Sequence, residues 1–162
     1  METRLMNMDH VPDERELVSL LGEKVYDYYR VIRENTVSLL LPDLEIWDHA
    51  GRRGKYFHGW QISKKSMTVD LYLSSIDGRG QITCSFHFIK RFFLKILKHR
   101  NDLSSEQVQQ AIDFSTKFNE ESGRGYSISM IIRDEEPLLD ILKIIKIVAT
   151  PARRGIQTTL RP

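Results

Sequence analysis

Three polar residues in the middle of the chain are the best candidates for chemistry: Asp70, Tyr72 and His87. A histidine exchanges a proton near neutral pH, a carboxylate beside it orients and charges its ring, and a tyrosine donates a hydrogen bond from a rigid ring. If these side chains share one surface, they can hold a small polar ligand. Alternatively, His87 can act as a general base that Asp70 orients.

The elements that must position these residues are two β-strands joined by a tight turn. Apolar residues alternate with polar ones through 67–73 and 82–88, which is the period of a half-buried strand. A two-residue loop at Asp77-Gly78 places residue 76 opposite residue 79, so every apolar residue meets an apolar partner. The predicted pairs are Leu73 with Ile82, Leu71 with Cys84, Val69 with Phe86 and Met67 with Phe88. The polar residues then share the opposite face, with His87 beside Thr68 and Asp70 beside Ser85.

A third strand precedes these two, because Trp60 and Ile62 continue the same alternation. A turn at Lys64-Lys65 would pair Ile62 with Met67 and Trp60 with Val69, and would put Gln61 in the row of Thr68 and His87. The sequence therefore predicts a three-stranded antiparallel meander.

Helical patterns surround the meander. Asp13 and Glu16 have the spacing of a capping box, and the apolar stripe that follows runs to about Leu41, with Gly22 as a break between two pieces. Residues 89–97 predict a helix with a cationic outer face. Ser104 is the expected cap of a further helix that ends near Gly123. The apolar stripe of that helix is expected to comprise Val108, Ala111, Ile112, Ser115 and Phe118.

The last two expected elements are a strand over 126–132 and a strongly apolar helix that starts after Asp134. This helix has only a narrow polar stripe of Asp140, Lys143 and Lys146, so it must be buried within the monomer or form a subunit interface, of which we favour the first. The order of elements predicts the α+β class, with an antiparallel β-sheet packed against helices in two layers. We expect one domain over residues 1–150 and a basic, flexible tail over 151–162.

The charged residues are segregated along the chain, although the formal net charge is only +2. Residues 51–100 hold 11 basic residues and 2 acidic ones, whereas residues 1–50 hold 5 basic and 11 acidic ones. Arg52, Arg53 and Lys55 lie in a glycine-containing loop before the meander, so we include them in the ligand site as groups that attract an anion. We do not expect a nucleic-acid partner, because the nearby aromatic residues lie on the core face and no nucleic-acid-binding motif occurs.

Several classes of protein are not expected. A single cysteine, Cys84, cannot form an internal disulfide, and the first ten residues lack the apolar stretch of a secretory signal, so we expect a cytoplasmic protein. Lys143 and Lys146 interrupt the longest apolar segment, so we expect no membrane-spanning helix. The histidines lack the close spacing of a zinc site, so no metal site is predicted and no cofactor is identified.

Short sequences in a particular order support one further expectation. They are MNMDHVPDERE at 6–16, Leu20-Leu21-Gly22, Gly54-Lys55-Tyr56, Gly59-Trp60, Leu71-Tyr72-Leu73 and the Gly-Arg-Gly sequence at 123–125. Over about residues 5–148 this order resembles an uncharacterised bacterial family, a domain of unknown function related to the YdhG-like group. The resemblance implies a compact α+β domain whose antiparallel sheet is covered by helices, and it transfers no catalytic residue.

The resemblance also raises iron binding, because some YdhG-like proteins have been proposed as frataxin-like iron chaperones. Exposed carboxylates would be needed, and Asp13, Glu14, Glu16, Glu23 and Asp27 are the candidates. The basic middle of the chain and the lack of a dense acidic run argue against this function.

The function expected from the sequence is noncatalytic binding of a small polar or anionic ligand by Asp70, Tyr72 and His87 with the loop residues Arg52, Arg53 and Lys55. The alternatives are an enzyme that uses His87 and Asp70, and a protein-interaction or homodimer module that uses the apolar helix at 138–148.

Overall fold

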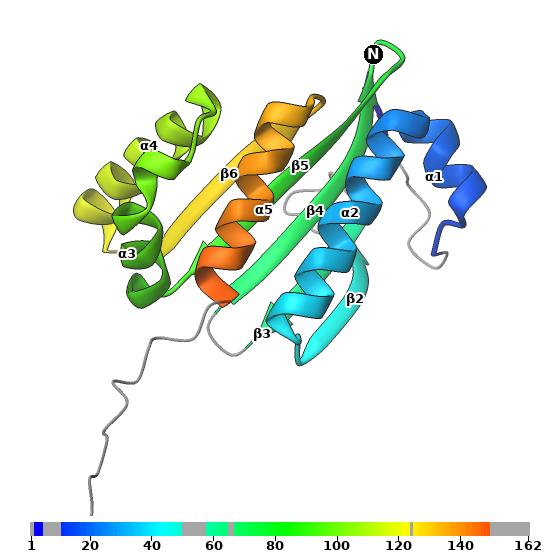
Figure 1. The fold of residues 1–162 in the computed structure, drawn as a ribbon. Helices are drawn as coiled ribbons and strands as arrows, with labels where there is room; N and C mark the ends of the chain where they lie inside the picture. The colour runs from blue at the N-terminus through cyan, green and yellow to red at the C-terminus, as the bar shows by residue number, and fades with distance from the viewer. Residues whose placement is uncertain (1, 5–10, 50–57, 65–66, 124, 150–162) are drawn as a thin grey trace, which may run out of the picture.

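The computed structural model describes residues 2–4, 11–49, 58–64, 67–123 and 125–149. The α-helices are α1 (Glu14–Leu21), α2 (Glu23–Leu40), α3 (Lys90–Lys98), α4 (Glu106–Ser122) and α5 (Glu135–Ala149), with a short 3₁₀ turn, η1 (Arg100–Asp102), before α4. The strands are β1 (Glu2–Arg4), β2 (Leu44–His49), β3 (His58–Lys64), β4 (Met67–Ile76), β5 (Arg79–Phe88) and β6 (Tyr126–Ile132). Helices α2 and α5 cover one face of the sheet, and α3 and α4 lie beside β6 (Figure 1). The predicted α+β class with a helix layer on an antiparallel sheet is confirmed.

The sheet has the strand order β2-β3-β4-β5-β6, and β1 also pairs with β4; all pairs are antiparallel. Asp77 and Gly78 both have positive φ, 50° and 77°, as a two-residue hairpin loop requires. The four apolar pairs predicted across β4 and β5 are confirmed. Their side chains are among the most buried in the protein, with Val69, Leu71, Ile82, Cys84 and Phe86 fully inaccessible to solvent.

The predicted register between β3 and β4 was wrong by two residues. Lys64 lies opposite Met67, so Ile62 pairs with Val69 and Trp60 with Leu71. Strand β3 keeps Lys64 in its ladder, one residue beyond the expected end of the strand. Because the shift is an even number, the alternation of faces is unchanged. Gln61 is therefore opposite Asp70 in the backbone ladder, not opposite Thr68.

The first two helices form as the sequence predicts. Asp13 accepts the Glu16 amide at 2.9 Å while the Glu16 carboxylate accepts the Asp13 amide at 2.8 Å, which is the capping box. Gly22, with φ 77°, ends α1 and precedes α2. The end of α1 then lies directly against β5, where the carbonyl of Leu21 approaches Gly80.

Helix α5 packs within the monomer, as we favoured, with Ile141, Ile144 and Ile145 fully buried. The prediction that Asp140 belongs to an exposed polar stripe was wrong, because its side chain is fully buried. It accepts the backbone amides of Ser104 and Ser105 at 3.1 and 2.7 Å. The N-cap of α4 is Ser105 instead of Ser104, and its side chain makes no capping bond. Asp140 from another helix accepts the amide of the N-cap residue itself.

Helix α4 lies along the outer edge of β6, and its side chains bond to outward-facing backbone groups of Ser127 and Ile131. The Gln107 amide donates to the Ile131 carbonyl at 2.9 Å and accepts the Ile131 amide at 2.5 Å. The Ser115 hydroxyl accepts the Ser127 amide at 3.1 Å. Phe118 was expected in the core but is 42% exposed and stacks on Phe114, which is 70% exposed, because only a narrow stripe of α4 faces the strand.

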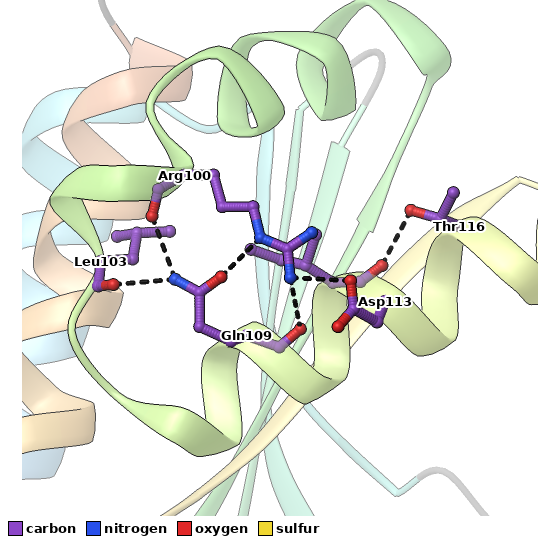
Figure 2. A network of polar contacts seen from close by, with 6 residues as sticks. Arg100, Leu103, Gln109, Asp113 and Thr116 are labelled. Carbon is purple, nitrogen blue, oxygen red and sulfur yellow. Dashed lines mark hydrogen bonds and ion pairs between the residues drawn. The ribbon is translucent and has the colours of Figure 1, made fainter.

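A network of hydrogen bonds and one ion pair connects η1 to α4 (Figure 2). The Arg100 guanidinium donates to the Gln109 side chain at 2.5 Å and contacts the Asp113 carboxylate at 2.7 Å, while the Gln109 amide donates to the carbonyls of Arg100 and Leu103. These contacts are internal to the turn and the helix that follows it, so we assign them a structural role. No helix among the described residues combines the length and apolar character needed to cross a membrane. The predicted tail at 151–162 lies outside the described residues.

Candidate functional site

The candidate site is the face of the sheet opposite α2 and α5, where polar residues of β4, β5 and β6 form successive rows. Thr68, His87 and Ser127 make one row, and Asp70, Ser85 and Ser129 make the next. Tyr72 and Thr83 follow in a third row. Because residues two apart on a strand share a face, the alternation that buries Val69 and Phe86 also gathers these groups.

His87 is the centre of the site because each of its ring nitrogens has a hydrogen-bonding partner. Its Nε2 lies 3.1 Å from Oδ2 of Asp70, diagonally across β4 and β5. Its Nδ1 lies 2.8 Å from Oγ of Ser127 on β6. The three side chains form a continuous chain of hydrogen bonds across three neighbouring strands.

The members of this chain differ in their access to solvent. Asp70 is 5% exposed, whereas the side chain of His87 is 50% exposed and Ser127 is exposed. A buried carboxylate that contacts a half-exposed imidazole orients the ring while leaving its edge open to solvent. The predicted neighbourhood of Asp70 and His87 is therefore observed as a direct contact.

Tyr72 shares the face but lies farther from His87 than from Asp70. It is half-buried and opposite Thr83, two rows from His87. The rows are about 7 Å apart along a strand. A ligand that contacts both Tyr72 and His87 would therefore have to extend across two row spacings. Arg52, Arg53 and Lys55 lie outside the described residues, and their part in the site stays a prediction.

Sequence reasoning missed the contribution of β6. Ser127 completes the chain to His87, and the Ser129 hydroxyl lies 2.7 Å from that of Ser85. The serines alternate with Ile128 and Met130, so the signal was present in the sequence. The alternation in β6 points to the site only once β6 is known to pair with β5, because two helices separate these strands in the sequence.

An arginine, Arg133, lies at the far end of the same sheet face. Arg133 donates to the Gln81 side chain from both Nε, at 3.0 Å, and Nη2, and Gln81 itself is buried. Gln81 and His87 are six residues apart on β5, a separation of about 20 Å. Arg133 and His87 therefore belong to opposite ends of the polar face.

The described residues give little support to a metal site or to a cysteine nucleophile. Within the part of the chain that the structure describes, no group of three His, Cys, Asp or Glu residues is arranged to hold a metal ion. Cys84 lies on the other side of the sheet and is fully buried; that burial raises the pKa of its thiol, and the negative charge of Asp70 raises it further. A thiol held protonated in this way is a poor nucleophile.

Comparison with protein-family models, with curated proteins and with solved structures found no match. The resemblance to the YdhG-like group therefore stays a prediction, and function has to be argued from the residues themselves.

Proposed function

We propose that the protein binds a small polar or anionic ligand, without transforming it, on the sheet face that carries Asp70, Tyr72 and His87. The observation that supports this proposal best is the fixed orientation of His87. Its ring is held from two sides, by Asp70 at 3.1 Å and by Ser127 at 2.8 Å, and still exposes half of its surface. A side chain that is already ordered loses little conformational entropy when a ligand binds, so binding is favoured.

The chain of hydrogen bonds also suggests how an anion is bound. When His87 is protonated, both ring nitrogens are donors, to Asp70 and to the Ser127 oxygen. The hydroxyl hydrogen of Ser127 is then available to an anionic oxygen of the ligand. The imidazolium and the Asp70 carboxylate together are close to neutral, so the buried carboxylate repels the ligand less than it would alone. Arg52, Arg53 and Lys55 would add attraction.

Thermal denaturation of the full chain tests the proposal, with inorganic phosphate, citrate and glutamate as millimolar probes. We expect at least one probe to raise the melting temperature, and we expect His87→Ala to abolish the increase. His99→Ala is the matched control, because His99 is 49% exposed and also contacts an aspartate, Asp102, at 3.3 Å. Equal increases in both variants, or none with any probe in the wild type, would contradict the proposal.

A further inference from the structure

The hydrogen-bond chain on the polar face has the composition of an activated nucleophile: a serine hydroxyl, an imidazole within reach of it, and a carboxylate that orients the imidazole. We propose that Ser127 is a nucleophile that takes an acyl group from a reactive acyl donor, such as an aryl ester or a thioester, with His87 as its general base. This activity goes beyond the binding function and does not depend on it, because it uses the neutral form of His87 and a bond to the Ser127 oxygen.

The partners of His87 determine which nitrogen can act as the base. A carboxylate only accepts hydrogen bonds, so the contact of Asp70 with Nε2 requires the hydrogen to be on Nε2 in the neutral ring. Nδ1 is then an acceptor, and the contact of 2.8 Å with Ser127 is a hydrogen bond that the hydroxyl donates. The free base therefore faces the nucleophile, as general-base catalysis requires.

The scaffold holds this geometry on regular elements. Asp70, His87 and Ser127 come from the adjacent strands β4, β5 and β6, and the antiparallel ladders fix their separations. The backbone of Ser127 is fixed from its other side by the Ser115 hydroxyl on α4. Sites built on strands keep their geometry better than sites built on loops.

The same contact limits the substrates. Because the Ser127 amide donates to Ser115, it is not available to stabilise the negative charge that develops on the carbonyl oxygen during acyl transfer. Acyl donors with good leaving groups need less stabilisation of this negative charge. Aryl esters and thioesters are therefore the expected class, and amides are not.

The reaction balances without an additional reagent. The Ser127 oxygen bonds to the carbonyl carbon of the donor while its proton moves to Nδ1 of His87, and Asp70 stabilises the imidazolium. The bond to the leaving phenol or thiol then breaks, and His87 returns the proton to the leaving group. The product is an ester on Ser127, which water hydrolyses by the same steps, with His87 again as the base.

The experiment uses p-nitrophenyl acetate as the probe on the full chain at pH 8. Release of p-nitrophenol is followed optically, and the acetylated residue is located by peptide mass spectrometry. We expect an acetyl group on Ser127, and its rate of formation should fall about 10²-fold or more in His87→Ala. Asp70→Asn should reduce the rate as well, because an amide at this position no longer enforces the neutral tautomer that leaves Nδ1 free.

Matched variants keep the test independent of folding and of simple ligand binding. Ser38→Ala is the control for Ser127→Ala, because Ser38 is an exposed serine on α2, across the sheet from the site, and contacts the Asn35 carbonyl of its own helix. Each variant's melting temperature is measured alongside. The proposal is overturned if the wild type forms no adduct or is acetylated only on lysines. It is also overturned if the Ser127 adduct forms at an unchanged rate in His87→Ala.

The nucleophile and the binding function can fail independently of each other. Absence of the adduct with retained phosphate or citrate binding would reject the nucleophile alone. A Ser127 adduct without any ligand-induced stabilisation would reject the binding function alone.

Discussion

The carboxylate of Asp140 on α5 accepts the backbone amide of Ser105 at 2.7 Å, so one helix caps the start of another. Both residues are buried, and Asp140 is fully inaccessible. A buried amide that loses its partner is not compensated by water. We therefore expect Asp140→Ala to lower the free energy of unfolding by about 2–3 kcal/mol, measured by urea denaturation. Asp140→Asn, which keeps one acceptor oxygen, should lose less.

Glu136→Ala on the exposed start of the same helix is the control for that change. It should alter the free energy of unfolding by no more than about 0.5 kcal/mol. A similar small effect from Asp140→Ala would contradict the capping role.

Gly80 should be intolerant of a side chain. A Cβ built on it would overlap the Leu21 carbonyl group at the end of α1, and backbone cannot move aside as a flexible side chain can. We expect Gly80→Ala to destabilise the protein by about 2–3 kcal/mol through displacement of α1 from β5. Gly125→Ala, in the Gly-Arg-Gly sequence at 123–125, is the matched control, because a Cβ built there would lie 3.4 Å from its nearest neighbour, the Phe88 carbonyl oxygen. Equal melting temperatures for the two variants would rule out the predicted clash.

Gln107 should protect the backbone of β6 from solvent. Its amide both donates to and accepts from the backbone of Ile131. Gln107→Ala should increase hydrogen exchange at the Ile131 amide and lower the free energy of unfolding by about 1 kcal/mol. Gln110→Ala, which removes only an exposed contact with Glu106, should leave exchange at Ile131 unchanged. If both variants exchange alike, Gln107 has no protective role.

Cys84 should make the fold less stable at alkaline pH. Its buried thiol has a raised pKa in the folded state, whereas in the unfolded chain a thiol ionises near pH 8.5. Above that pH the unfolded state releases a proton that the folded state retains, so stability falls as pH rises, by up to about 1.4 kcal/mol per pH unit. Urea denaturation between pH 8 and pH 10 should show a steeper decline for the wild type than for Cys84→Ala. Parallel curves for the two proteins would show that the thiol does not contribute.

Much of the fold was predictable because its signals are local. The alternation through β4 and β5, the Asp77-Gly78 loop and the Asp13 capping box each involve residues close in sequence, and each prediction was confirmed. The loop after β3 carried a weaker signal, because Lys64, Lys65 and Ser66 are all compatible with a turn. The register there was consequently wrong by two residues.

Relationships between distant elements were not predictable in the same way. An aspartate among isoleucines has the spacing of a solvent-facing stripe, and nothing local shows that Asp140 meets the start of α4. Phe118 fits an apolar stripe, and its exposure follows from α4 lying at a sheet edge. In the candidate site, the pairing of Asp70 with His87 followed from the hairpin register, whereas Ser127 required the position of β6.

The amide of Gln107 also affects how the molecule meets others of its kind. An exposed edge strand can pair with a strand of another polypeptide, and such pairing commonly starts aggregation into fibrils. At Ile131 an incoming strand would first have to displace a side chain that already satisfies both main-chain groups. Side chains of α4, Gln107 at Ile131 and Ser115 at Ser127, therefore oppose the addition of a further strand at this edge of the sheet.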